Sequence, residues 1–562
     1  MISPLYLESN AAKPALRVAV LLDEPQVPRW VATILEDLTR CNFVDIELVV
    51  VQDASGMAQG GLAQRLPALT DAMYARVTQA LVGDRDPQVL VDPQVWLLDV
   101  DRVVVPAAEA EGELRLSASA LTELARRDLD VILRFCSAVP RGAVLHAARC
   151  GVWSFHHLID GNRRGRRPIF RGSPGNGAMV EVELEVLADE PGDGLVLCRS
   201  TFGRHGSIFD ALQRQVSTWE TTHFVLWKLH DLHAFGWEQV QRQAVPRSPR
   251  IDVAERAPLA VATDVARLVL PSFTSKVRRM LAPPPPSVHR WHVGLRPMKE
   301  PLCSAPGARD ATDFTWLVAP LGHYWADPFL FERDGKLYLF VEDFVYDRQF
   351  AGISYAEVFA DGTVGPATSC LDPGFHLSFP YVFEHEGEIF MLPESLSNGT
   401  ITLYRATRFP DEWVQDKVLF QGNATDTALH REGGKFYFFT TLFDRDDRGM
   451  KTILFVADSL RGAWRMHPSN PISSDVRSGR GAGAIFRRDG RLLRPVQNCG
   501  PHYGYGFTLD EILTIDPERY EERPFCWVDP SNLSIPAQGV HTYNFAGDFE
   551  VIDSYTMGPR PR

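Results

Sequence analysis

The segment Ala326–Asp343, ADPFLFERDGKLYLFVED, decides the fold of the C-terminal half of this chain. It contains an apolar strand, a tight turn at Asp334 and Gly335, and a second strand rich in aromatic and aliphatic residues. A glycine after an acidic residue supplies the positive φ that a two-residue hairpin turn requires. The segment therefore predicts a β-hairpin.

The same pattern recurs at intervals of about 50 residues, and each interval has room for four strands. Such recurrence is typical of the blades of a β-propeller. We therefore predict an all-β domain at residues 300–562 that forms a five-bladed propeller. The other four repeats are Phe379–Ser395, Asp426–Thr441, Ala482–Asn498 and His541–Thr556, with turns at or near Gly387, Gly433, Gly490 and Gly547.

The N-terminal half alternates between strand-like and helix-like patterns. Arg17–Leu22, Asp45–Val51 and Asp130–Phe135 are short apolar runs that are typical of buried parallel strands. Ala118–Arg127 has helical spacing. This alternation favours a doubly wound, Rossmann-like α/β sheet, which binds ligands beyond the carboxyl ends of its strands. We expect this α/β domain at residues 15–215.

We predict a helical connector at residues 216–290, between the two domains. Residues 217–241 have a helical pattern, and residues 257–281 predict a second helix. The four prolines at Pro283–Pro286 favour an extended, semi-rigid spacer. A domain boundary is therefore expected close to this run.

Composition restricts the class of protein. With 562 residues, of which 45% are hydrophobic and 23% charged, the chain is expected to form at least two globular domains. A net charge of −13 argues against nucleic acid or an anionic membrane as a general partner, because phosphate binding needs surplus Lys and Arg. No segment reaches the roughly 18 to 20 consecutive apolar residues that a transmembrane helix needs.

The cysteines and the N-terminus indicate the compartment. The 8 cysteines are scattered without a CxxC pair, so neither a zinc site nor a disulfide-rich scaffold is expected. The N-terminus has no basic region followed by a long apolar stretch, so no secretion signal is expected. Both patterns favour a cytoplasmic protein without a metal site, and they leave the oligomeric state open.

Three motifs in the N-terminal half predict a catalytic site. Gly151–His157, GVWSFHH, ends a predicted strand, and Phe170–Pro174, FRGSP, forms a glycine-containing loop. Gly192–Leu197, GDGLVL, places Asp193 directly before another strand. With this spacing, a histidine pair, a glycine-containing loop and an aspartate can converge on one pocket.

These motifs resemble the catalytic domain of folate-dependent formyltransferases, over roughly Arg17–Gln213. The resemblance implies transfer of a formyl group from 10-formyltetrahydrofolate to an amino sugar or sugar nucleotide. Ser154 stands where the family has an asparagine, and its hydroxyl offers a single, shorter donor to the oxyanion. By position, the resemblance implies catalytic roles for Ser154, His156 and Asp193, and substrate binding by His157, Arg171 and Gly172.

The WADPF and FVED segments resemble the propeller region of plant glucosamine inositolphosphorylceramide transferases and the five-bladed fold of furanosidase-type glycoside hydrolases. Residues that open the inner strand of each blade surround the central channel of such a propeller. We therefore expect Asp327, Asp426 and His541 to bind carbohydrate there. The second blade has Ser378, Phe379 and Pro380 where the hydrolases place an aspartate, which argues against hydrolysis because a glycosidase needs two carboxylates.

The sequence thus predicts an enzyme of glycan or glycoconjugate biosynthesis, in which the first domain transfers a formyl group and the propeller holds the carbohydrate. Two alternatives stay open. In one, the propeller itself is a glycosyltransferase or a glycosidase, with Asp327 and Asp426 central. In the other, the protein binds glycans without catalysis.

Overall fold

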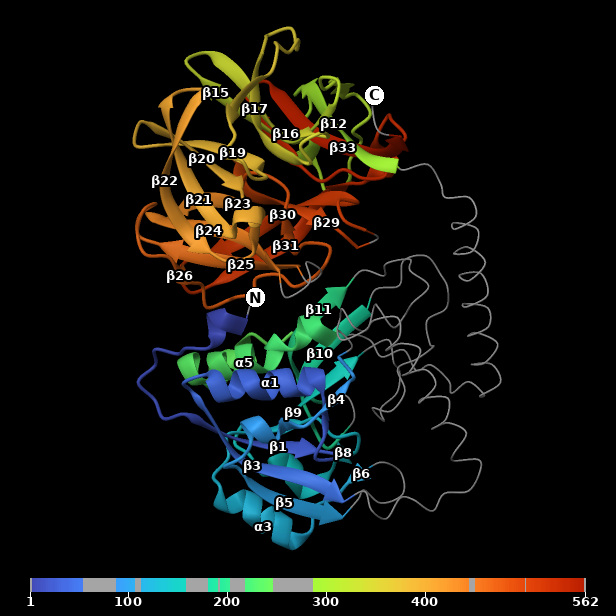
Figure 1. The fold of residues 1–562 in the computed structure, drawn as a ribbon, viewed down its shortest axis with the longest axis vertical. Coiled ribbons are helices and arrows are strands. Elements are labelled where there is room, and N and C mark those ends of the chain that lie inside the picture. Colours follow the sequence, from blue (N-terminus) through green and yellow to red (C-terminus); the bar gives the residue numbers. More distant parts are fainter. Residues whose placement is uncertain are drawn as a thin grey trace, which may run out of the picture. The chain divides into compact units, whose positions relative to one another are not determined.

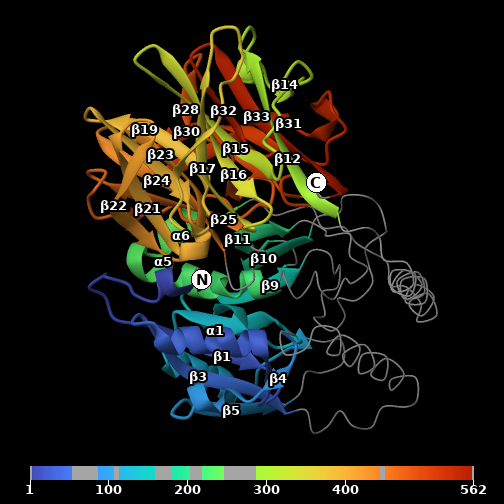
Figure 2. The same cartoon turned by 45° about the horizontal axis from the view of Figure 1, so that its top comes forward.

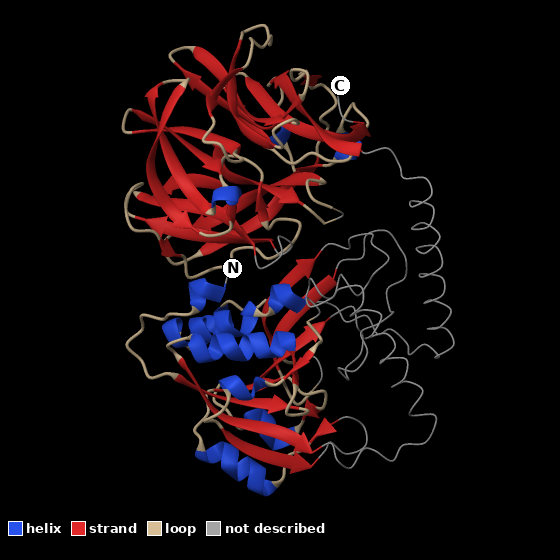
Figure 3. Ribbon diagram, in the orientation of Figure 1, coloured by secondary structure: helices blue, strands red, loops and turns tan. Residues whose placement is uncertain are grey.

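The computed structural model describes residues 3–53, 87–106, 113–157, 180–190, 193–202, 218–245, 287–443, 450–500 and 502–559. It divides into two compact units, Ile2–Val277 and Arg278–Arg562. The N-terminal unit contains helices and a mixed sheet, and the C-terminal unit is built almost wholly of strands (Figure 3). No helix of the described residues is long and apolar enough to cross a membrane.

The N-terminal unit is built around a seven-stranded sheet of order β11-β10-β9-β7-β1-β3-β5. The five strands from β9 to β5 are parallel, as the sequence predicts, but β10 and β11 form an antiparallel hairpin at one edge. The sheet is therefore mixed. Its strands are β1 (Leu16–Leu22), β3 (Val44–Asp53), β5 (Asp101–Pro106), β7 (Val131–Arg134), β9 (Val152–His157), β10 (Val180–Val186) and β11 (Leu195–Phe202).

Helices cover both faces of this sheet because successive residues of its buried strands point to opposite sides. Val20 and Leu22 pack with residues of α1 (Arg29–Arg40), whereas Ala19 and Leu21 pack with residues of α3 (Ala118–Arg126). The remaining elements are α5 (His223–Phe235), α6 (Trp237–Arg242) and the short strands β2 (Val27–Pro28), β4 (Leu90–Val91), β6 (Glu113–Leu114) and β8 (Val139–Pro140).

The predicted connector is only partly described. The helix expected at 217–241 is broken into α5 and α6 at Gly236, whose φ of 88° no other residue type adopts easily. The second expected helix and the run Pro283–Pro286 lie outside the described residues.

The C-terminal unit is the predicted five-bladed propeller, with one sheet for each blade (Figures 1 and 2), and these sheets are antiparallel except for the parallel pair of β13 and β31. The hairpin turns fall where the glycines predict them, and Gly335, Gly387, Gly490 and Gly547 all have positive φ. The first blade comprises β15 (His323–Arg333), β16 (Lys336–Val345), β17 (Phe350–Val358) and β18 (Thr368–Leu371). The second comprises β19 (Ser378–His385), β20 (Glu388–Glu394), β21 (Thr400–Arg408) and β22 (Glu412–Gln421). The third comprises β23 (Ala424–Glu432), β24 (Lys435–Phe443), β25 (Met450–Ala457) and β26 (Arg465–Met466).

The last two blades contain strands from distant parts of the sequence. The fourth has β13 (Gly307–Ala308) at its edge, beside β27 (Arg480–Gly481), β28 (Phe486–Arg488), β29 (Arg491–Asn498), β30 (Gly506–Ile515) and β31 (Tyr520–Val528). The fifth has the order β14-β12-β33-β32, with β12 (Ser287–Pro297), β14 (Thr315–Trp316), β32 (Tyr543–Ala546) and β33 (Phe549–Pro559). Because β12 pairs with β33 along its whole length, from Ser287↔Pro559 to Pro297↔Phe549, the first and last strands of the unit close the ring.

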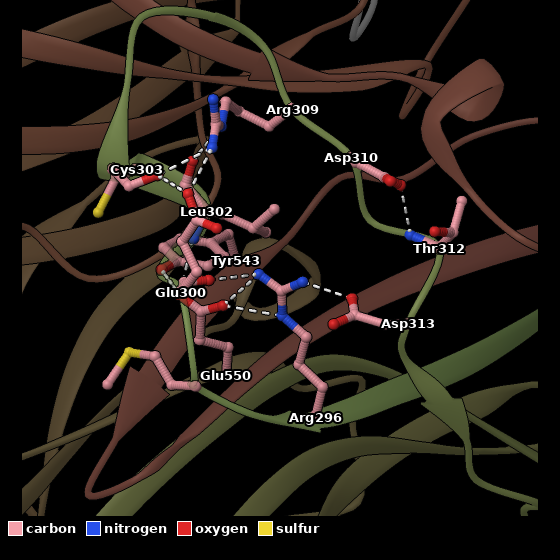
Figure 4. A network of polar contacts seen from close by, with 12 residues as sticks. Arg296, Glu300, Leu302, Cys303, Arg309, Asp310, Thr312, Asp313, Tyr543 and Glu550 are labelled. Atoms are coloured by element: carbon pink, nitrogen blue, oxygen red, sulfur yellow. Dashed lines mark hydrogen bonds and ion pairs between the residues drawn. The ribbon is translucent and has the colours of Figure 1, made fainter.

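A buried ion pair fixes this closure (Figure 4). Arg296 of β12 donates from Nη2 and Nε to Glu550 Oε2 of β33, at 2.7 and 3.0 Å. The other carboxylate oxygen accepts from Tyr543 Oη at 2.6 Å and from the backbone of Leu302 at 3.1 Å. Glu550 is 0% exposed, so each of its hydrogen bonds replaces one lost to water.

We expect Glu550→Gln to lower the free energy of unfolding by about 1.5–3 kcal/mol, because the buried Arg296 keeps its contact with the exposed Asp313 but loses its charged hydrogen bonds to Glu550. Urea titration followed by tryptophan fluorescence measures this loss. The matched control is Glu412→Gln, since Glu412 pairs with Arg408 on the exposed surface and should change stability little. A loss no larger than that of the control would contradict the assigned role of the pair.

Candidate functional site in the propeller channel

The inner strands of the first three blades share a local distortion that shapes the channel. Asp327, Phe379 and Asp426 have φ of 47°, 48° and 49°, and the strand pairing shifts register at each of them. Residues other than glycine rarely adopt this conformation, so its repetition marks a feature that the surrounding contacts impose. The distortion places these three residues at equivalent points of successive blades.

Asp327 links three blades. Its Oδ1 accepts a hydrogen bond from Thr542 Oγ1 at 2.7 Å, and its Oδ2 accepts one from the backbone of Phe379 at 3.1 Å. Its own backbone N–H donates to Asp553 Oδ2 at 3.2 Å. The carboxylate is buried and occupied by protein donors on both oxygens.

His541 lies beside Asp327, as the sequence predicts. Its Nδ1 is 2.7 Å from Asp553 Oδ2 and 3.7 Å from Asp327 Oδ1. Its ring stacks on Trp291 with the centroids 4.1 Å apart. Burial alone would lower the pKa of His541, but the charges of Asp553 and Asp327 outweigh it, so the pKa lies above its ordinary value.

Asp426 forms the opposite side of the cluster through an ion pair with Arg480 Nε. The Arg480 guanidinium lies over the ring of Tyr503, 4.8 Å from its centroid, and the Tyr503 ring is 5.6 Å from that of His541. Tyr503 thus bridges the two sides. The hairpin pattern of the sequence predicts a role for neither Arg480 nor Asp553. Arg480 lies in the two-residue strand β27, and Asp553 lies in the second strand of its hairpin.

Second strands supply two further carboxylates, Glu342 and Glu394. Glu342 Oε1 accepts from Tyr324 Oη at 3.4 Å and lies 3.7 Å from His376 Nε2. Glu394 Oε2 accepts from Ser378 Oγ at 2.8 Å. The second blade therefore contributes a carboxylate, although its inner strand has Phe379 where an aspartate was expected.

Burial of several carboxylates in one place alters their protonation. Burial raises the pKa of Asp327 to about 6, and it raises the pKa of Glu394 to about 7 with a contribution from the charge of Asp426. Burial, followed by the charges of Asp327 and Glu394, raises the pKa of Glu342 well above its ordinary value. The site therefore offers both carboxylate acceptors and carboxylic-acid donors near neutral pH.

Aromatic rings surround this polar cluster. Tyr324 stacks on Phe344 with the centroids 4.6 Å apart, and Tyr346 lies 5.7 Å from Tyr324. The ring of Tyr555 packs on that of Trp291 with the centroids 4.7 Å apart, and Trp291 also stacks on His541. Carboxylates beside aromatic faces are suited to bind a sugar, because the sugar hydroxyls hydrogen-bond to the carboxylates and the sugar C–H groups pack on the aromatic rings.

The same cluster is the place where the described residues could hold a cation. One ligand atom from each of Asp327, His541 and Asp553 lies within 4.8 Å of the others. The sequence predicts no metal site. In the observed arrangement, His541 Nδ1 lies 2.7 Å from Asp553 Oδ2 and 3.7 Å from Asp327 Oδ1.

The described structure places only some of the residues proposed from the formyltransferase resemblance. Ser154 is buried in β9, and its Oγ accepts from Arg134 Nη1 at 2.9 Å. Asp193 is exposed and lies just before β11. The first residue of β11, Leu195, pairs with Val186 of β10, which in turn pairs with Trp153 near the start of β9. His156 is near the other end of β9, so the strand register separates its backbone from Asp193.

The remaining residues of that resemblance are only partly placed. The backbones of His156 and His157 end β9, but their side chains lie outside the described residues. Arg171 and Gly172 also lie outside the described residues. Their proposed roles in substrate binding stay predictions.

We expect the stability of the protein to fall as pH rises from about 5 to 8, in part because of Glu394. Its pKa of about 7 exceeds the ordinary value near 4.5, so folding takes up a proton in this window and the charged form is penalised above it. The isosteric Glu394→Gln carries no charge. Between these pH values, the free energy of unfolding of Glu394→Gln should fall by about 1–3 kcal/mol less than that of the wild type.

Urea midpoints at several pH values measure this difference. Glu384→Gln, at the outer end of β19, is the control and should follow the wild-type pH dependence. Parallel pH profiles for the wild type and Glu394→Gln would show that the Glu394 carboxyl titrates normally.

Comparison with known proteins places the propeller among named relatives. A protein family described as “Glucosamine inositolphosphorylceramide transferase 1, N-terminal” matches residues 314–545. A glucosamine inositolphosphorylceramide transferase 1 of Oryza sativa subsp. japonica is 31% identical over 310 residues, which cover 51% of this chain and 42% of the relative. The Arabidopsis thaliana protein of the same name is 35% identical over 264 residues, which cover 46% of this chain and 33% of the relative.

The chain thus spans less than half the length of these relatives. Among solved structures, a family 117 glycoside hydrolase of Zobellia galactanivorans is 12% identical, with a TM-score of 0.32 over 44% of this chain and 88% of that one. The catalytic domain of a family 62 α-L-arabinofuranosidase of Coprinopsis cinerea is also 12% identical, with a TM-score of 0.32 over 44% of this chain and 96% of that one.

Proposed function

We propose that the protein takes part in a glycan-related transferase reaction, in which the propeller channel binds the sugar part of a glycoconjugate. One observation carries this proposal: Asp327, His541 and Asp553 meet in the channel, with Glu342 and Glu394 nearby and aromatic rings around them. This combination provides both the polar and the apolar contacts that a pyranose ring needs.

The contacts of the carboxylates favour binding over hydrolysis. Asp327 already accepts hydrogen bonds from Thr542 and Phe379, and Glu394 accepts one from Ser378. A retaining or inverting glycosidase instead needs two carboxyl groups that are free to act on the scissile bond or on a water. Glu342 has the weaker protein contacts, at 3.4 and 3.7 Å, and is the carboxyl group best suited to meet a ligand.

The relatives support a transferase setting. Their name refers to glucosamine and to inositolphosphorylceramide, so we propose a glycosylated or phosphorylated lipid as the class of ligand. The matched family describes the N-terminal part of such proteins. We therefore assign ligand binding, rather than the complete transfer reaction, to the propeller.

Formyl transfer from 10-formyltetrahydrofolate to an amino sugar stays a prediction from sequence alone. It requires an imidazole and a carboxylate at one site. The strand register instead separates the backbones of His156 and Asp193.

We expect Glu342→Gln to weaken sugar binding by about twofold to tenfold, because the amide changes the donor and acceptor that this buried carboxyl group offers a ligand, and a neutral hydrogen bond is worth roughly 0.5–1.5 kcal/mol. Isothermal titration with glucosamine, N-acetylglucosamine, inositol and inositol phosphate measures the affinity. Two controls should bind as the wild type does: Glu384→Gln, which removes an exposed carboxylate from the same propeller, and His156→Ala in the N-terminal unit.

Unchanged affinity in Glu342→Gln, together with a loss in His156→Ala, would move the sugar site to the N-terminal unit. That result would favour the formyltransferase hypothesis over the propeller site.

A further inference from the structure

Two aliphatic side chains project into solvent from the connection between β14 and β15. Val318 is 90% exposed and Leu321 is 83% exposed, more than any other large hydrophobic residue of the described part of the chain. Their neighbours Leu317 and Ala319 instead pack against the core formed by Val293 and other buried residues. The backbone of Leu317 also donates to Val293 O at 2.8 Å. The loop is thus anchored, with Val318 and Leu321 directed outward.

The sequence around these side chains lacks charge. Residues 314–326, FTWLVAPLGHYWA, contain no Asp, Glu, Lys or Arg, although 23% of the chain is charged. Pro320 is also exposed. We refer to residues 317–322 as the apolar loop.

The apolar loop lies at the end of the propeller where the inner strand of the first blade begins. Gly322 O accepts from the backbone of Tyr346 at 3.0 Å, and Tyr346 belongs to the aromatic group beside Glu342. His323, the next residue, places its Nδ1 2.8 Å from Asp343 Oδ1. Asp327 follows four residues later on β15. The loop and the sugar-binding residues therefore share one end of the blade.

We propose that the apolar loop inserts into the interface of a lipid bilayer and so brings the mouth of the channel close to ligands in the membrane. Two aliphatic side chains are too few for a stable protein interface, which buries about 800 Å² on each partner. Insertion into a bilayer has no minimum area, and a small apolar surface gives weak and reversible binding. The nature of the ligand rests on the proposed function, whereas the membrane contact rests on the loop itself.

Charge selects the kind of bilayer. The protein carries a net charge of −13, and the apolar loop contributes no lysine or arginine. Anionic lipid attracts basic segments and repels acidic proteins. Binding should therefore be at least as strong on zwitterionic phosphatidylcholine vesicles as on vesicles that also contain phosphatidylserine, and added salt should not weaken it.

Vesicle co-sedimentation of the full chain tests the proposal. We expect the double variant Val318→Asp with Leu321→Asp to reduce partitioning onto phosphatidylcholine vesicles by about tenfold or more. The matched control is Val414→Asp with Leu513→Asp, which changes two other exposed aliphatic residues, at 41% and 44% exposure on β22 and β30, and should bind as the wild type does.

Equal partitioning of the wild type and the loop variant would overturn the proposal. The proposal would also be overturned if the wild type formed a dimer without lipid and the loop variant did not, because the loop would then bind a second copy of the chain. The sugar affinity distinguishes this test from that of the proposed function. The loop variant should keep the wild-type affinity for soluble sugars, and Glu342→Gln should keep the wild-type affinity for vesicles.

Discussion

The buried carboxylate of Asp553 holds the two ends of the propeller together at the channel. Its Oδ1 accepts from the backbone N–H groups of His541 and Thr542 at 2.9 and 3.0 Å, and its Oδ2 accepts from the backbone of Asp327 at 3.2 Å. The last repeat is thereby fixed to the first. Together with the pairing of β12 and β33, this contact closes the ring.

The same closure creates the electrostatic character of the channel. It brings Asp553 and Asp327 to His541, and the neighbouring blades add Glu342 and Glu394. Concentrated negative charge in a buried place costs stability, which appears as raised pKa values of the carboxyl groups. Groups perturbed in this way are typical of functional sites, where they interact with a ligand instead of water. The apolar loop at the same end of the blade adds an apolar contact to this polar site.

The sequence predicts those features of the fold that depend on local chemistry. Asp334 and Gly335 mark a hairpin turn by themselves, and the spacing of such turns predicts the five blades. The positions of Asp327 and His541 follow from the same repeat, because each begins an inner strand. The contact between them confirms that these residues meet, although they are far apart in the chain.

Features that depend on contacts between distant segments could not be predicted in this way. Nothing in the pattern of β12 assigns it to the last blade, and Glu394 replaces the expected aspartate only because Ser378 faces it across the hairpin. The position of Asp193 likewise depends on the antiparallel direction of β10, which a short apolar run does not reveal. The N-terminal site rests on fold resemblance alone and stays a prediction.

A crystal structure of the protein soaked with an amino sugar would locate the ligand without relying on a variant. We expect a sugar at the channel mouth, with a hydroxyl or amine on Glu342 and a ring face on the surrounding aromatic residues. A sugar bound on the outer strands of the blades, or in the N-terminal unit with the channel closed by its own side chains, would contradict it.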